Sequence, residues 1–383
     1  MTLKKIFTLV AGVSILSITT AAKAFETKAH NAILMDYETG AYLFTKNHQD
    51  KIAPASMSKL MTVYVLLSKL KEGEISLEDK FTVSENAWRK GGAASGGSTM
   101  FLKIGQEVKV EDLIKGIIIQ SGNDACITVA ENIAGSETEF AALLNETAEK
   151  IGLHNAHFVN ATGLPHPEHR ISVEDLAKLA RRIIQEFPEF YHVFKEKEFT
   201  FNGIKQGNRN PLLYSLKGSD GLKTGHTDEA GYCLTGSVVR GDRRLIEVVA
   251  GLSSNKERAE ETESLMTWGF AGFDNYKLFK ENQIMAEIPV WYGTSPSVHA
   301  IVPQNVIKTV KKSTKNKYGA KTVYDTPLKA PVFKGDKVGE LFITYGDNVV
   351  DKIPLIAKED VAKIGPFSRF LANLKYFVFG MEK

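Results

Sequence analysis

The hydrophobic pattern of this chain changes near residue 276, and this change limits the folds that the chain can adopt. Before residue 276, segments such as 123–134 and 172–186 repeat apolar residues at the spacing of amphipathic helices. After it, short segments such as 286–292 and 337–343 alternate apolar and polar residues, separated by Gly, Pro and Asp. With 383 residues, the chain is long enough for two domains. We expect a larger domain over residues 25–275 and a small all-β domain over residues 276–364.

Strands are predicted in the larger domain as well. Residues 32–36 and 41–44 flank a turn that contains Gly40, and residues 232–239 and 244–250 flank Arg-Gly-Asp-Arg. Both patterns are typical of strands joined by tight turns, and the second is a strong hairpin signal. The larger domain therefore combines strands with helices. The predicted helices cover residues 56–71, 110–119, 123–134, 137–151 and 172–186, with a further one ending near 268–270.

The N-terminus has the features of an export signal. Lys4 and Lys5 precede an apolar run over residues 6–18, and Ala22-Lys23-Ala24 then offers a small-x-small cleavage site. We expect cleavage of residues 1–24; an uncleaved membrane anchor is the weaker alternative, because the apolar run is short for a span. Cleavage removes three lysines and no acid, so 48 basic and 45 acidic residues become 45 and 45. A neutral mature chain gives no reason to expect nucleic-acid binding.

The end of the chain forms an amphipathic pattern. On a helical wheel, residues 366–383 place Arg369, Tyr376 and Lys383 opposite an apolar face, with Phe379 as the exception. The segment is too short and too polar to span a bilayer. We predict that residues 365–383 form a helix that anchors the protein to a membrane surface, with docking on its own domain as the alternative. The apolar face consists of Phe367, Phe370, Leu371, Leu374, Phe377, Val378 and Met381.

The cysteines and histidines do not suggest a disulfide scaffold or a metal site. Cys126 and Cys233 are too few for such a scaffold, and we expect two separate buried thiols. His166 and His169 lie in a Pro-rich loop, and no pair of a histidine with a carboxylate stands out, so no metal or other cofactor is predicted. A lysine-rich segment over residues 308–321 is interpreted as a solvated surface.

Residues 84–98 hold four glycines around Trp88 and an Arg-Lys pair. This composition is typical of a mobile surface loop. Such a loop could act as a lid beside a cleft, or it could be a plain connection.

A lysine interrupts an otherwise buried helical pattern over residues 53–67. Lys59 follows Ser56 by three residues, so the two side chains share one helical face, and the helix start places Ser56 near unpaired backbone N–H groups. A lysine can activate a serine hydroxyl only when the amine is neutral. Burial, the positive end of the helix and a second cation such as Lys223 would each lower the pKa of Lys59. Ser56 is therefore a candidate nucleophile and Lys59 a candidate base.

The local Ser-x-x-Lys motif is too common to carry this interpretation alone, because it occurs three times in the chain. Its order with two further motifs is more specific. Ser56-Met-Ser-Lys59 precedes Ser121-Gly-Asn123, and Lys223-Thr-Gly225 follows both. This is the order found in the penicillin-recognising serine enzymes.

The sequences that flank these motifs make the resemblance more specific. Segments 115–126, 195–202 and 221–226 resemble the D-alanyl-D-alanine carboxypeptidases, which are low-molecular-mass penicillin-binding proteins of Gram-negative bacteria (serine peptidase family S11, class C type-5 subfamily). The resemblance covers essentially the whole chain. It implies an α+β catalytic domain of the serine β-lactamase/transpeptidase type, with a five-stranded antiparallel sheet between helical regions, followed by the small all-β domain.

The resemblance also implies an activity and a location. Such an enzyme removes the terminal D-alanine from peptidoglycan pentapeptides through an acyl-enzyme, and β-lactam antibiotics acylate it. It is exported to the periplasmic face of the inner membrane and attached there by its C-terminal helix.

The resemblance assigns roles to five residues in the reaction. Ser56 attacks the carbonyl between the two D-alanines, with Lys59 as general base. Ser121 and Lys223 pass a proton to the leaving amine, and Asn123 orients Lys59 and the substrate amide.

Further residues are expected to bind the substrate. Backbone N–H groups of Ser56 and His226 would form the oxyanion hole. Thr224 and Arg258 resemble the family's positions that hold the terminal carboxylate, and Gly225 belongs to the same substrate-binding strand.

Three other functions are possible. Class A β-lactamases have Asp where Gly122 stands here and add a glutamate for deacylation, for which this sequence has no matching segment. A DD-endopeptidase would use almost identical chemistry. A non-catalytic wall-binding module is disfavoured, because the five reactive side chains are intact.

Overall fold

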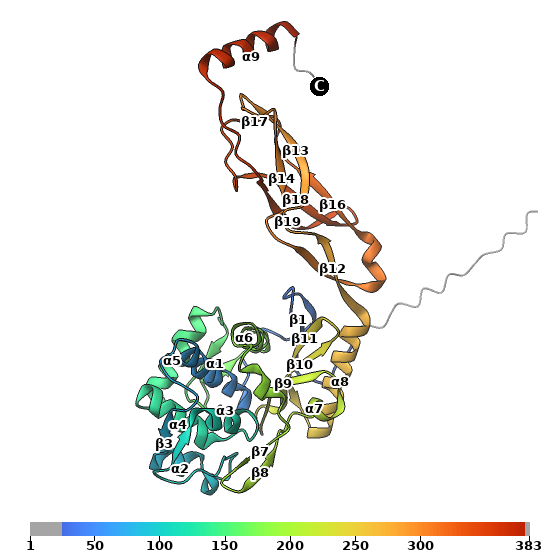
Figure 1. Cartoon of the computed structure of the whole chain (residues 1–383). Helices are drawn as coiled ribbons and strands as arrows, with labels where there is room; N and C mark the ends of the chain where they lie inside the picture. The colour runs from blue at the N-terminus through green and yellow to red at the C-terminus, as the bar shows by residue number, and fades with distance from the viewer. Residues whose placement is uncertain (1–24, 380–383) are drawn as a thin grey trace, which may run out of the picture.

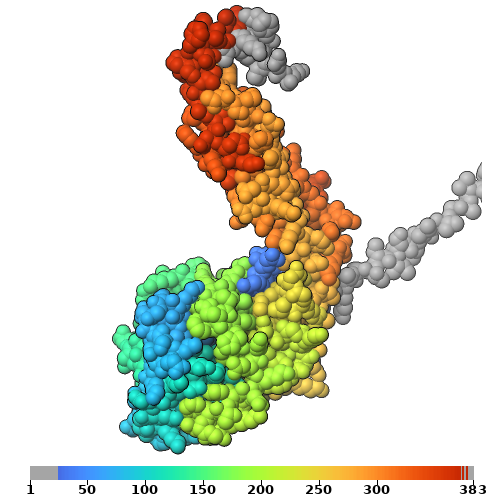
Figure 2. Space-filling model, viewed as in Figure 1, coloured from blue at the N-terminus to red at the C-terminus, as the bar shows by residue number. Residues whose placement is uncertain are grey.

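The computed structural model describes residues 25–379 and shows two parts (Figure 1). A larger body of helices and strands carries an elongated β-rich part, and the helix α9 lies across the far end of that part. The space-filling view shows the same shape, with the β-rich part standing on the larger body as a stalk (Figure 2). The predicted export signal, residues 1–24, lies outside the described residues, as do the last four residues of the predicted tail.

A five-stranded antiparallel sheet forms the centre of the larger body, in the order β2-β1-β11-β10-β9. This confirms the sheet that the resemblance implied, and both predicted strand pairs are part of it. Lys223, Thr224 and Gly225 lie on β9, which is an edge strand. The strands are β1 (Asn31–Asp36), β2 (Tyr42–Lys46), β9 (Ser219–Thr227), β10 (Gly231–Arg240) and β11 (Arg243–Leu252).

Both faces of the sheet are covered, which explains why its central strands are apolar almost throughout. Ile33 and Val248 face the core shared with the helices on one side. Leu34 and Val249 face the helix α8 (Asn255–Gly272) on the other side, where Leu265 packs against them. Burial of these side chains on both faces is the main source of stability for such a layered arrangement.

The predicted helices of the larger body are all present. Ser172 caps α6 by accepting a hydrogen bond from the backbone N–H of Asp175 at 3.1 Å. The helices are α1 (Lys59–Lys71), α3 (Val110–Ile118), α4 (Asn123–Ala134), α5 (Glu137–Lys150), α6 (Val173–Glu186) and the short α7 (Leu212–Ser215). Three small two-stranded sheets complete this part: β3 (Lys80–Thr82) with β4 (Glu107–Lys109), β5 (Ala156–His157) with β6 (Arg170–Ile171), and β7 (Glu198–Phe201) with β8 (Ile204–Gly207).

The prediction of a loop over residues 84–98 is wrong, because α2 (Glu85–Gly91) and a short 3₁₀ turn (Ala93–Ser95) occupy most of it. Ser84 caps α2 by accepting from the backbone N–H of Ala87 at 2.9 Å. Gly91 has a packing role: a Cβ at this position would lie 2.2 Å from the backbone nitrogen of Asp124. The glycine therefore lets α2 approach α4 closely.

The β-rich part begins at β12 (Phe273–Phe279), directly after α8, and has a core of its own that includes Ile288, Leu341 and Leu355. Its main sheet has the order β16-β18-β19-β14-β13-β17, and β12 pairs with β15. The remaining strands are β13 (Ile284–Trp291), β14 (Ser297–Ile301), β15 (Val306–Lys311), β16 (Tyr318–Val323), β17 (Leu328–Lys329), β18 (Lys337–Tyr345) and β19 (Asn348–Ala357).

The lysine-rich segment of this part makes local contacts. Lys308 pairs with Asp351, and the ammonium of Lys315 lies 4.2 Å from the centre of the Tyr276 ring. Lys311, Lys312, Lys315, Lys317 and Lys321 are exposed, which agrees with the interpretation of a solvated surface. Cys126 and Cys233 are both buried and free, which confirms the prediction of two separate thiols.

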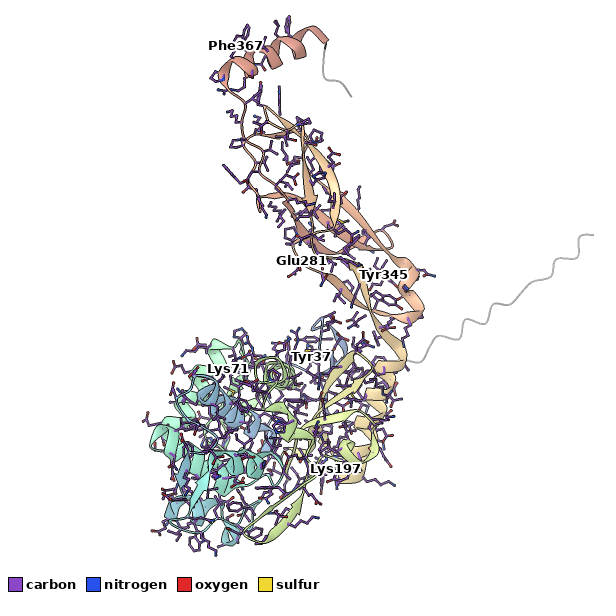
Figure 3. All side chains as sticks on the ribbon, in the orientation of Figure 1. Tyr37, Lys71, Lys197, Glu281, Tyr345 and Phe367 are labelled. Carbon is purple, nitrogen blue, oxygen red and sulfur yellow. The ribbon has the colours of Figure 1, made fainter. Side chains whose placement is uncertain are left out.

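The final helix, α9, spans Pro366–Phe379. Figure 3 shows Phe367 at the end of the β-rich part farthest from Lys71 and Lys197 of the larger body. Apolar side chains on α9 are strongly exposed: Phe367 is 74%, Phe370 63%, Leu371 49%, Leu374 50% and Phe377 88% exposed. Among the described helices, none is long and apolar enough to cross a bilayer.

Candidate active site

The candidate nucleophile lies on a 3₁₀ turn, Ala55–Ser58, that leads directly into α1. We predicted an α-helix from Ser56, but its first turn is tighter. A 3₁₀ helix has about three residues per turn, so side chains at i and i+3 eclipse each other. Ser56 and Lys59 are related in this way, and the Lys59 Nζ lies 2.9 Å from the Ser56 Oγ.

Lys59 is completely buried and holds three hydrogen-bond partners. Besides Ser56, its Nζ donates to the Asn123 Oδ1 at 2.8 Å and to the backbone carbonyl of Thr162 at 2.5 Å. Burial lowers the pKa of Lys59 to about 8. A substantial fraction of the amine is therefore neutral near physiological pH.

The edge strand β9 passes very close to the nucleophile turn, and Gly225 makes this possible. A Cβ at Gly225 would lie 2.8 Å from the carbonyl oxygen of Pro54 and 3.2 Å from the Ala55 Cβ. A side chain here would push β9 away from Ser56. The Lys-Thr-Gly motif thus needs its glycine for close packing of strand against turn.

Ser121 and Lys223 are also buried beside this site. The Ser121 backbone has φ +60°, which is uncommon for a residue other than glycine, and within residues 25–379 its Oγ has no hydrogen-bond partner. The Lys223 Nζ donates to the backbone carbonyl of Thr224 at 3.2 Å. Burial lowers the pKa of Lys223 well below its usual value, and the positive charges of Lys59 and Arg209 add to this effect.

A cavity of about 560 Å³ brings most of the predicted residues together. Arg258 reaches it from α8, and its Nη1 lies 3.4 Å from the backbone carbonyl of Gly225, while its Nη2 donates to Asn255 at 2.6 Å. The His226 ring packs on the Tyr232 ring, with centroids 4.0 Å apart. Of the predicted residues, Ser56, Ser121, Thr224, Gly225, His226 and Arg258 line this cavity.

A second cavity of about 390 Å³ shares Ser56 and His226 with the first and extends past Asn123 to Leu164. Ser56 therefore lies where two cavities meet. Neither cavity has an Asp or Glu among its described lining residues, whereas Arg209 lines both. The site is consequently positive and suits a substrate that carries a carboxylate.

Two contributors to this site are not marked by any sequence motif. Arg209 lies in the connection between β8 and α7 and donates to the Ser98 Oγ at 2.5 Å. No local motif marks it, because only the fold brings it beside Ser56. Thr162 takes part through its backbone carbonyl, so its side-chain identity carries no signal.

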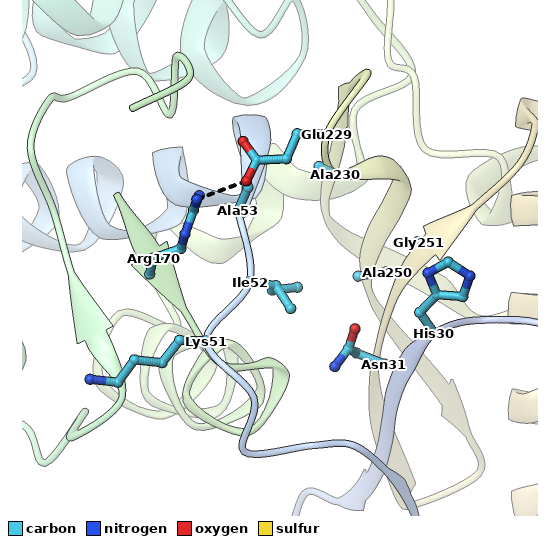
Figure 4. A pocket seen from close by; sticks show the side chains of 10 residues that line it. All are labelled: His30, Asn31, Lys51, Ile52, Ala53, Arg170, Glu229, Ala230, Ala250 and Gly251. Carbon is cyan, nitrogen blue, oxygen red and sulfur yellow. Dashed lines mark ion pairs between the residues drawn. The ribbon is translucent and has the colours of Figure 1, made fainter. Parts of the chain in front are cut away.

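A third cavity has a volume of about 330 Å³ (Figure 4). It is lined by Lys51, Ile52 and Ala53 among others, and an ion pair of 2.7 Å joins Arg170 to Glu229 at its wall. It shares no lining residue with the two cavities at Ser56.

Comparisons with known proteins show which family this chain resembles. Residues 18–254 match the D-alanyl-D-alanine carboxypeptidase family (peptidase S11), and residues 273–363 match the C-terminal domain of penicillin-binding protein 5. D-alanyl-D-alanine carboxypeptidase DacC of Escherichia coli is 42% identical over 88% of this chain and 85% of its own length.

Solved structures of penicillin-binding proteins are similar to this chain in both fold and sequence. Penicillin-binding protein 5 from Haemophilus influenzae has a TM-score of 0.83 at 36% identity, covering 89% of this chain and 99% of its own. Penicillin-binding protein 6B from Escherichia coli has a TM-score of 0.74 at 38% identity, covering 88% of this chain and 98% of its own. This chain belongs to the D-alanyl-D-alanine carboxypeptidase family, with the C-terminal domain of penicillin-binding protein 5.

Proposed function

We propose that this serine peptidase removes the terminal D-alanine from peptidoglycan pentapeptides through an acyl-enzyme on Ser56. The observation that carries the proposal is the buried Lys59, whose pKa is lowered to about 8 and whose Nζ lies 2.9 Å from the Ser56 Oγ. A serine next to a partly neutral lysine is an activated nucleophile.

The two other partners of Lys59 help it to act as a base. A neutral amine has two hydrogens and one lone pair. The Asn123 Oδ1 and the Thr162 carbonyl can only accept, so they take the two hydrogens. The lone pair is then directed at the third partner, the Ser56 hydroxyl, from which it takes the proton.

Acylation and hydrolysis follow from this arrangement. As the Ser56 Oγ bonds to the substrate carbonyl carbon, its proton moves to the Lys59 Nζ. Backbone N–H groups of Ser56 and His226 would stabilise the oxyanion, at about 3 kcal/mol for each donor. The C–N bond to the leaving D-alanine then breaks, and water later hydrolyses the Ser56 ester.

The leaving amine needs a proton, and Ser121 and Lys223 are proposed to supply it. The Ser121 Oγ is buried without a partner within the described part of the chain, so it is free to accept from Lys223 and donate to the amine once substrate is bound. A buried lysine with a lowered pKa gives up its proton readily.

The leaving D-alanine ends in a carboxylate, and the larger cavity has groups to hold it. Thr224 and Arg258 line this cavity, and Arg209 adds a further positive charge. We propose that these three residues select substrates with a free terminal acid.

The site favours a carboxypeptidase over a β-lactamase. A β-lactamase must hydrolyse its acyl-enzyme quickly, and no described residue that lines the cavities at Ser56 is a carboxylate base. Incubation with a labelled penicillin tests this: we expect a long-lived adduct on Ser56, whereas rapid turnover of the drug would favour the β-lactamase. A DD-endopeptidase remains the second candidate, since the chemistry at Ser56 would be the same.

Release of D-alanine from a pentapeptide tests the main proposal directly. Wild-type protein should release it, and Ser56→Ala should not. If the wild type released no D-alanine but still bound peptidoglycan sacculi, a non-catalytic wall-binding function would replace this proposal.

We further propose that the chain is exported and held at the periplasmic face of the inner membrane of a Gram-negative bacterium by α9. The exposed Phe and Leu side chains of α9 support this, since full burial of each such side chain stabilises by about 1.5–3 kcal/mol. Deletion of residues 366–383 should move the protein to the soluble fraction and leave peptide hydrolysis intact. Unchanged membrane association would refute the anchor. We also propose that the chain is divided into an export signal over residues 1–24, a catalytic domain over 25–275, a β domain over 276–364 and the terminal helix.

A further inference from the structure

His169 lies behind the nucleophile turn and is only 2% exposed. Its Nδ1 accepts a hydrogen bond from the backbone N–H of Val159 at 3.1 Å, and its Nε2 lies 2.7 Å from the Ser58 Oγ. Because Nδ1 accepts, the ring hydrogen is on Nε2, which donates to Ser58. Burial lowers the pKa of His169 to about 4, so the ring is neutral at physiological pH and keeps both bonds.

The two partners of His169 belong to two of the three chain segments that hold Lys59, the third being α4 with Asn123. Ser58 lies between Ser56 and Lys59 in the nucleophile turn. Val159 begins the segment that ends at Thr162, whose carbonyl accepts from the Lys59 Nζ at 2.5 Å. One imidazole therefore joins the turn that carries the nucleophile to the segment that orients its base.

The segment from Val159 to Gly163 is stiff, so its position at one end affects the other. The Asn160 Oδ1 accepts from the backbone N–H groups of Thr162 at 3.1 Å and Gly163 at 2.7 Å. Gly163 packs tightly on the nucleophile turn, because a Cβ there would lie 2.0 Å from the Ala55 carbonyl oxygen. A shift at Val159 is thus transmitted to the Thr162 carbonyl.

We propose that His169 is a positioning residue for acylation: through Ser58 and Val159 it sets the distance between the Ser56 hydroxyl, the Lys59 amine and the Thr162 carbonyl. This inference rests on the proposed function of Ser56 and Lys59. The neighbouring ion pair of Arg170 and Glu229 is a weaker candidate, because its side chains are 25% and 52% exposed and solvent-exposed ion pairs contribute little.

Two substitutions of His169 each remove one of its hydrogen bonds, to Ser58 or from Val159. In His169→Gln the amide nitrogen can still donate to Ser58, but no acceptor faces Val159. In His169→Asn the amide oxygen can still accept from Val159, but the side chain is too short to reach Ser58. Because the bridge needs both bonds, each variant should lower the rate constant for Ser56 acylation by labelled penicillin on the order of tenfold to a hundredfold.

A double-mutant cycle with Ser58→Ala distinguishes loss of the bridge from a general loss of stability. Ser58→Ala alone should reduce acylation to a similar extent, and adding His169→Asn should cause no further loss, since the bridge is already broken. If the His169 variants do not fold, Ser58→Ala still tests the bridge from its other end.

Tyr64→Phe is the control for stability. It removes a 2.6 Å hydrogen bond to Glu186 at a distant position on α1, so it should lower the melting temperature and leave acylation unchanged. If the wild type itself is not acylated, the proposed function fails. If the wild type is acylated but the Ser58 and His169 variants react at the wild-type rate per folded molecule, the bridge is overturned.

Discussion

Acylation of Ser56 should depend steeply on pH, because Lys59 can act as a base only when it is neutral. With a pKa of about 8, the neutral fraction of Lys59 is about 1% at pH 6, about 9% at pH 7 and about 91% at pH 9. The acylation rate should therefore rise about ninetyfold between pH 6 and pH 9, with its midpoint near pH 8. Without burial, a lysine with its usual pKa of about 10.4 would place this midpoint more than two pH units higher.

The assay is the rate of adduct formation between the protein and a labelled penicillin across this pH range, with folding checked at each pH. Lys59→Arg is the matched control, because a guanidinium keeps a positive charge and hydrogen-bond donors but stays protonated. It should be inactive at every pH. An acylation rate in the wild type that is constant or falls between pH 6 and pH 9 would refute the assignment of Lys59 as the base.

The lowered pKa of Lys59 should also make the stability of the protein depend on pH. Between about pH 8 and pH 10.5 the unfolded lysine keeps its proton while the folded one has lost it, so the unfolded state binds more protons. The Lys59 contribution to the free energy of unfolding therefore rises with pH across this window, by about 3 kcal/mol. Below pH 8 the buried ammonium is destabilising, which is a cost of holding the base ready for reaction.

Three further substitutions test buried contacts of the larger body. Gly225→Ala should displace β9, because the new Cβ would lie 2.8 Å from the Pro54 carbonyl; we expect slower acylation and a lower melting temperature, and unchanged values for both would contradict this packing. Glu247→Met should raise the free energy of unfolding by about 1–3 kcal/mol at pH 7 in urea titrations, because the Glu247 carboxyl is buried without a partner among the described residues. Burial raises the pKa of Glu247 well above its usual value, so its contribution to stability falls as pH rises above about 4.5, and the benefit of the substitution should be smaller at pH 4. Asp124→Asn should cost about 1–3 kcal/mol, because its carboxylate accepts from the backbone N–H of Leu102 at 3.1 Å and an amide nitrogen there could not; thermal unfolding at the wild-type temperature would refute this.

The elements that could be predicted from sequence are those specified by local patterns. The hairpin of β10 and β11 was predicted because a tight Gly-containing turn lies between two apolar runs. The helix α6 was predicted because its apolar period and the Ser172 cap agree. In both cases the residues that decide the structure are neighbours along the chain.

Predictions failed where a distant contact decided the outcome. The glycines of residues 84–98 suggested a loop, yet Gly91 is required because α4 packs directly on α2. The first turn of the predicted helix at Ser56 is a 3₁₀ turn, in which Ala55 has φ +47° beside Gly163 of another segment. Neither contact can be seen from residues close in sequence.

By itself, the sequence determined the family, the fold class and the order of the three motifs around Ser56, Ser121 and Lys223. Motif order and hydrophobic period are properties of the chain itself and are present before folding. Tertiary packing is what buries Lys59 completely, brings the Thr162 carbonyl and Arg209 to the site, and sets His169 between Ser58 and Val159. The physical reason is that burial, and the pKa that follows from it, depend on which distant segments pack around a side chain.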